Sequence, residues 1–145
     1  MVLENKRVGF DYQILEEFEA GMVLHGFEVK ALRKGLGSLK GARVVARGGD
    51  AYLVGATIPP WQQKNAPKSY DPERTRRLLL NRKEINQITG AESAQGLTIV
   101  PLKVYNKGRH LKLLIGIARG KKKEDRRHSI REREEKRRMS RTLKR

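Results

Sequence analysis

Cationic side chains are concentrated at the end of the chain, in residues 119–145. This stretch holds 14 Lys and Arg residues against 5 Asp and Glu, within a chain of net charge +17. Clustered cations bind phosphates, because each neutralised phosphate releases condensed counterions. The charge therefore indicates a polyanionic partner, with nucleic acid as the first candidate and an anionic membrane surface as the second. A helix lying on a membrane needs a broad apolar face. The sizeable apolar side chains of this stretch are only Ile130, Met139 and Leu143.

The same stretch has the spacing of a helix that is weak by itself. Ser129 and Glu132 fit a capping box, in which each side chain satisfies the other's backbone N–H. Two pairs of opposite charge at i,i+4 spacing follow, Glu132–Lys136 and Glu134–Arg138. Each is worth about 0.2–0.5 kcal/mol. Since the stretch has no core to bury, we predict a basic tail over 120–145. It is disordered alone and forms a helix from Ile130 to Leu143 on a polyanion.

Carboxylates cluster near the start of this basic chain, at Asp11, Glu16, Glu17 and Glu19. One interpretation is that they form weak surface ion pairs with nearby Lys and Arg. The other is that a carboxylate accepts hydrogen bonds from nucleobase amino groups or orients an arginine on a phosphate. The residues alone favour the surface pairs.

Several kinds of chemistry lack their residues. The chain has no cysteine, and His25, His110 and His128 have no ligand-spaced neighbours, so we expect no disulfide and no metal site. No phosphate-binding lysine loop or nucleophile elbow is present. We therefore expect a protein that is not an enzyme and needs no cofactor. The N-terminus has no apolar signal segment, which favours a cytoplasmic location, and we expect a monomer.

The elements that present these charges are predicted mainly as strands. Phe10, Tyr12 and Ile14 alternate with polar residues, which is typical of a half-buried strand. Residues 43–55 have the pattern of a hairpin around Gly48-Gly49. A second hairpin is predicted where 97–105 and 110–118 flank a polar turn, with Pro101 marking an edge or a bulge.

Two helices complete the prediction. Gly26–Arg33 is helix-compatible, and a longer helix is predicted to start at Asp71-Pro72-Glu73. The longer helix would run past Ile88 and expose a basic face made of Arg74, Arg76, Arg77, Arg82 and Lys83. In the proline-rich loop 56–73, Trp61 either stacks on a base or folds back onto the core. The fold class is mainly β (α+β): residues 1–119 form a small antiparallel barrel of oligonucleotide-binding type with flanking helices, followed by the basic tail.

An ordered set of short motifs resembles the SsrA-binding proteins, also called small protein B. They are Asn5-Lys6, Tyr12, Phe18-Glu19-Ala20-Gly21, the run Gly26–Arg33, Asp71-Pro72, Arg76-Arg77-Leu78-Leu79-Leu80, Val100-Pro101-Leu102-Lys103 and Gly120-Lys121-Lys122. The resemblance spans essentially the whole chain. It implies a bacterial cytoplasmic RNA-binding factor that binds the tRNA-like domain of transfer-messenger RNA and enters stalled 70S ribosomes in trans-translation. It further implies a protein body that takes the place of an anticodon arm, with its tail in the decoding centre and the empty mRNA channel.

The resemblance also implies site residues. An RNA-binding face would include Asn5, Glu19, Leu79, Asn81 and Lys112, continued by Lys121 and Lys122, and the basic side chains Lys30, Arg33, Arg76 and Arg77 are assigned to it as well. The ribosome-contacting tail residues would be Glu124, Asp125, Arg126, Arg127, His128, Arg133, Arg137, Met139 and Leu143. Glu124 departs from the family, which has a ring-bearing residue there. Either the ring contact is dispensable, or His128 one turn along takes its place.

Two other functions remain open on composition alone. A general basic RNA-binding or ribosomal structural protein shares the charge but needs neither a folding tail nor a preferred RNA. An enzyme that hydrolyses stalled peptidyl-tRNA is disfavoured, because the chain has Gly48-Gly49-Asp50 where release factors resemble one another in a Gly-Gly-Gln tip.

Overall fold

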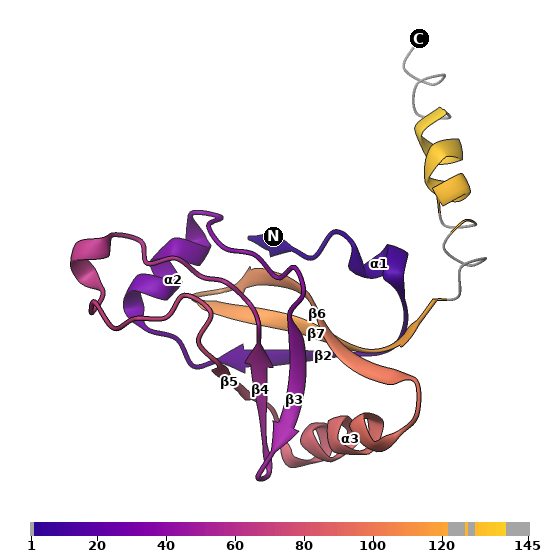
Figure 1. Ribbon diagram of the computed structural model, residues 1–145, viewed down its shortest axis with the longest axis horizontal. Coiled ribbons are helices and arrows are strands. Elements are labelled where there is room, and N and C mark those ends of the chain that lie inside the picture. The colour runs from indigo at the N-terminus through magenta and orange to yellow at the C-terminus, as the bar shows by residue number, and fades with distance from the viewer. Residues whose placement is uncertain (1, 122–126, 128–129, 139–145) are drawn as a thin grey trace.

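Seven antiparallel strands form one sheet in the order β1-β6-β7-β2-β5-β4-β3 in the computed structural model, which describes residues 2–121, 127 and 130–138 (Figure 1). The strands are β1 (Leu3–Glu4), β2 (Tyr12–Met22), β3 (Arg43–Arg47), β4 (Asp50–Val54), β5 (Arg76–Leu79), β6 (Leu97–Lys107) and β7 (His110–Gly120). The helices are α1 (Val8–Asp11), α2 (Gly26–Arg33), the 3-10 turn η1 (Gln63–Asn65) and α3 (Arg82–Ser93). The predicted mainly β class is therefore confirmed.

The sheet curls around one main core without closing fully. Strand β3 approaches β6, but within the described residues the edge strands β1 and β3 do not pair, so the predicted barrel is an open one. The core takes Leu53, Leu113 and Ile115 from the strands, and the helices add Leu32 from α2 and Ile88 from α3. Burying such side chains is the main stabilising term, at about 25 cal/mol per Å² of apolar surface.

Most of the predicted local elements are confirmed. Helix α2 and both hairpins form as predicted, and the β6–β7 ladder shifts register between Pro101 and Lys103, which is the expected bulge. Trp61 packs against the core rather than standing free, with the Lys34 ammonium 5.3 Å from its ring centroid. Phe10 differs from the prediction, since it lies in the single turn of α1 and β2 begins at Tyr12.

The predicted long helix from Asp71 is wrong. Residues Arg76–Leu79 form strand β5, in which alternate side chains are buried and exposed, and α3 begins only at Arg82. The true start has its own signal: Asn81 Oδ1 accepts the Glu84 N–H at 2.8 Å, and Glu84 Oε1 accepts the Asn81 N–H at 3.1 Å. This capping box outweighs the Asp-Pro start because tertiary pairing of β5 with β2 and β4 overrides local propensity.

A fully buried carboxylate, that of Glu28 in α2, ties the helix to β5 and to the loop before it. The Arg76 guanidinium donates to Glu28 Oε2 at 2.8 and 3.0 Å and to the carbonyls of Ala56 and Pro72. Arg74 pairs with the same carboxylate, and the Tyr70 phenol lies 2.9 Å from it. Burial by itself would raise the pKa of Glu28, but hydrogen bonds from Arg74, the His25 backbone N–H and Arg76 lower it to about 2.

The tail is partly described, and residues 130–138 are helical there, outside the sheet (Figure 1). The predicted helix from Ile130 to Leu143 extends beyond this range, and its dependence on a polyanion stays a prediction. No helix among the described residues is long and apolar enough to cross a membrane.

Neighbouring arginines of β5 give a matched stability test. Arg76→Met should lower the free energy of unfolding by about 3–5 kcal/mol, because it leaves the buried Glu28 carboxylate short of its main partner. Arg77→Met removes an exposed ion pair with Asp50 at 3.1 Å and should cost about 0–1 kcal/mol. Denaturant titration of both variants measures the difference, and equal losses would contradict the structural role of the Glu28–Arg76 pair.

Candidate nucleic-acid interface

The strand register brings several predicted site residues onto one outer face of the sheet. Gly21 of β2 pairs with both Leu79 of β5 and Lys112 of β7, and Lys112 in turn pairs with Tyr105 of β6. Glu19 lies two residues before Gly21 and therefore on the same face. Directly paired residues project to the same side of an antiparallel sheet. We call Glu19, Gly21, Leu79, Tyr105 and Lys112 the strand face.

Glu19 is held in place within this face. Its Oε2 accepts a hydrogen bond from the Tyr105 phenol, and its Oε1 lies 3.0 Å from Lys107 Nζ. The hydrogen bonds from Tyr105 and then Lys107 lower the pKa of Glu19 below its usual range, so the side chain stays ionised at neutral pH. Burial and the Glu19 carboxylate raise the pKa of Tyr105 to about 12, so the phenol keeps its proton.

Leu79 is an exposed apolar side chain on this charged face, with 52% of its surface accessible. The Leu79 side chain packs closely over Gly21, since a Cβ added at that glycine would lie only 3.2 Å from the Leu79 Cβ. An apolar platform beside a fixed carboxylate and a lysine suits the face and edge of an unstacked base, with the cation near the backbone phosphate.

Asn81 and Asn5 are two further predicted RNA contacts, and the side chain of each forms a hydrogen bond within the protein. Asn81 is exposed but caps α3 through its side-chain oxygen, which leaves its amide N–H₂ available. The Asn5 amide nitrogen donates to the Pro101 carbonyl at 3.0 Å and lies 3.5 Å from the Leu39 carbonyl. Asn5 therefore fastens the N-terminal segment to β6 and does not join the strand face.

Among the basic residues assigned to the RNA-binding face, Arg76 does not lie on the surface. Its side chain is 0% exposed and pairs with Glu28. The sequence-based prediction that Arg76 belongs to an exposed basic face is therefore wrong. Arg77 is exposed and pairs with Asp50, and Arg33 donates to the Arg109 carbonyl at 2.7 Å. Lys30 is exposed on α2.

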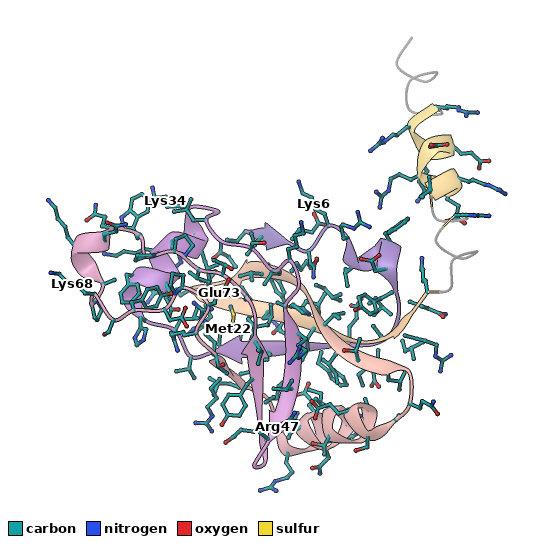
Figure 2. The ribbon with its side chains drawn as sticks, viewed as in Figure 1. Lys6, Met22, Lys34, Arg47, Lys68 and Glu73 are labelled. Carbon is teal, nitrogen blue, oxygen red and sulfur yellow. The ribbon has the colours of Figure 1, made fainter. Side chains whose placement is uncertain are left out.

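Cations outside the strand face are spread over the surface. Figure 2 shows Lys6 after β1, Lys34 after α2, Lys68 in the loop before β5, and Arg47 near the β3–β4 turn. Lys121 follows β7, where its backbone N–H donates to the Asp11 carbonyl at 2.9 Å and its Nζ to the Gly9 carbonyl at 3.0 Å. The body therefore presents positive charge on several sides, which favours polyanionic partners.

The tail residues fall into two groups. Arg127, Arg133 and Arg137 are exposed on helical backbone. The other predicted contacts lie outside the described residues: Lys122, Glu124, Asp125, Arg126, His128, Met139 and Leu143.

Sequence reasoning missed Tyr105, Lys107 and Gly21. The predicted turn at 106–109 would place Tyr105 opposite His110, whereas the observed shorter turn at Gly108-Arg109 pairs Tyr105 with Lys112. The position of Tyr105 therefore followed only from the observed strand register. The contribution of Gly21 depends on its pairing with Leu79 of β5. Because that segment was predicted as a helix, the role of Gly21 could not be inferred from the sequence.

These features define a small, basic, antiparallel β-sheet protein with a mixed polar and apolar strand face, an architecture that suits oligonucleotide binding. A family model described as "SmpB protein" matches residues 2–145. The chain is 43% identical over its whole length to an SsrA-binding protein of Gloeothece citriformis, covering 94% of that protein. It is 45% identical over 143 residues to the SsrA-binding protein of Latilactobacillus sakei, covering 99% of this chain and 91% of the relative.

A solved structure also matches this chain in sequence and in fold. A chain of "tmRNA-SmpB: a journey to the center of the bacterial ribosome" is 40% identical and superposes with a TM-score of 0.70, covering 90% of this chain and 94% of that one. The chain belongs to the SmpB family of SsrA-binding proteins, as the sequence motifs predicted.

Two substitutions of Asn81 separate its cap from its amide. Asn81→Ala removes both and should lower the free energy of unfolding by about 0.5–2 kcal/mol, whereas Asn81→Ser keeps a cap oxygen and should cost little. If the amide N–H₂ contacts RNA, both variants should lose the same affinity for the tRNA-like RNA implied by the family motifs. Weakened RNA binding in the Ala variant alone would show that Asn81 acts only through helix α3. Denaturant titration and RNA-binding measurements on the same samples decide between these results.

Proposed function

We propose that this chain binds the tRNA-like domain of transfer-messenger RNA through its strand face and delivers that RNA to stalled ribosomes in trans-translation. The observation that carries the proposal is the placement of Glu19, Leu79 and Lys112 side by side on β2, β5 and β7. It is supported by relatives that are named SsrA-binding proteins and by the likeness to the tmRNA-SmpB chain. The role is one of binding and positioning, without catalysis of its own, in the bacterial cytoplasm.

The body and the tail have different tasks in this proposal. The body takes the place of an anticodon arm, so its basic sides face both transfer-messenger RNA and the ribosome. The tail, from about Gly120, reaches the decoding centre and lies in the empty mRNA channel of the small subunit. A basic segment suits an RNA-walled channel because neutralising phosphates supplies the binding energy. An ordering cost that is met only in an empty channel would restrict engagement to ribosomes without message.

Arg137 offers a test of whether the tail works as a helix or as a charged tether. Arg137→Pro removes a backbone donor within the helix of residues 130–138 and clashes with the carbonyl of Arg133, at a cost of about 3 kcal/mol or more. Arg137→Ala removes the same charge and keeps a good helix former. We expect peptide tagging on stalled ribosomes to collapse in the Pro variant and to fall only slightly in the Ala variant, while both bind RNA normally.

The opposite pattern would be equally clear. Equal tagging by the two Arg137 variants would contradict a helical role for the tail and leave only its charge. A control measurement of RNA affinity ensures that neither variant has lost the preceding step.

A further inference from the structure

The carboxylate of Glu19 is an unusual feature for a surface that binds RNA. An acid repels phosphates, so it contributes to binding only if it meets a hydrogen-bond donor of the RNA, such as a base N–H or a ribose hydroxyl. A flexible glutamate in a chain of net charge +17 would instead sample many rotamers and pair with whichever lysine is near. The structure removes that freedom through two neighbours on β6.

Tyr105 and Lys107 approach Glu19 from the adjacent end of the β6–β7 hairpin. The Tyr105 phenol donates to Oε2, and Lys107 Nζ lies 3.0 Å from Oε1, so each carboxylate oxygen has one defined partner. An ionised carboxylate accepts about four hydrogen bonds. Two acceptor positions therefore remain, and about a third of the Glu19 side chain is still exposed to receive donors.

The phenol of Tyr105 is itself fixed. Tyr105 pairs with Lys112 across the β6–β7 ladder, and Lys103 Nζ lies 5.6 Å from its ring centroid. Lys107 is 65% exposed, and exposed ion pairs hold geometry weakly. Tyr105 is therefore the main holder of the carboxylate, with Lys107 as the second.

We propose that Tyr105 and Lys107 are positioning residues, which hold the Glu19 carboxylate as a fixed, ionised acceptor for hydrogen-bond donors of the bound RNA. This inference rests on the proposed function, because it concerns how the same strand face engages the tRNA-like RNA. Neither residue needs to touch the RNA for this role. Preorganisation improves affinity because the ordering of the side chain is completed before the RNA arrives.

A double-mutant cycle on the full chain tests the main holder. Dissociation constants for the tRNA-like domain of transfer-messenger RNA are measured for the wild type, Tyr105→Phe, Glu19→Gln and the double variant. We expect Tyr105→Phe to weaken binding about three- to tenfold in the wild-type background and to have no further effect once Glu19 is Gln. Tyr52→Phe is the matched control, since no phenol hydrogen bond is described for Tyr52 of β4, and it should leave affinity unchanged.

The same design separates a positioning lysine from a phosphate contact. Lys107→Met should lose its effect in the Glu19→Gln background if Lys107 acts through the carboxylate. A loss that persists there would show direct contact with RNA and overturn the role of Lys107. The Glu19 carboxyl pKa, followed by NMR, should rise toward its ordinary value in Tyr105→Phe, a change that general destabilisation would not produce.

The outcomes distinguish the inference from the function on which it depends. A wild-type chain without affinity for the tRNA-like domain would refute the proposed function itself. If the wild type binds and Glu19→Gln weakens binding while Tyr105→Phe is silent, the function stands and the positioning inference is wrong. Additive losses in the double variant would also overturn the inference, because they would mean that Tyr105 and Glu19 act separately.

Discussion

The buried carboxylate of Glu28 sets the geometry on which the strand face depends. A charge inside the core is costly unless it is paired and hydrogen-bonded, and Arg76 and Arg74 meet that need. Because the Arg76 side chain must point inward to reach Glu28, its neighbours Arg77 and Leu79 must point outward. A slip of one residue in β5 would turn Leu79 into the core and expose Arg76. The ion pair therefore specifies the register of the short strand that completes the interface.

In the proposed function the protein meets two RNAs, and the sheet and the basic C-terminal stretch suit different parts of that task. Precise recognition needs side chains held on strands, as Glu19, Leu79 and Lys112 are on β2, β5 and β7. Entry into a channel needs a thin segment that follows its walls, for which a core is unnecessary. The composition changes at the end of β7, where apolar residues become few and charged residues predominate, and this change separates the two demands.

The sequence predicted the parts of the fold that rest on local patterns. Alternation and turn residues gave both hairpins and the bulge near Pro101, and the ordered motifs gave the family. The helix predicted from Asp71 was wrong because β5 is a strand through its pairing with β2 and β4. Pairing between distant segments cannot be seen in a local sequence pattern. The predicted exposure of Arg76 failed for a related reason: its partner Glu28 is 48 residues away and buried. Within the site, the sequence named Glu19 but not Tyr105, whose contribution requires the strand register.

The central claim is that the strand face selects one structured RNA rather than RNA in general. The most direct measurement is the affinity of the full chain, at about 0.15 M salt, for the tRNA-like domain of transfer-messenger RNA and for an unrelated folded RNA of the same length. The account predicts that both affinities fall as salt rises, since phosphates contribute to each. It also predicts a preference of tenfold or more for the tRNA-like domain that persists across the salt series. Equal affinities with equal salt slopes would contradict the account and identify a general basic RNA-binding protein.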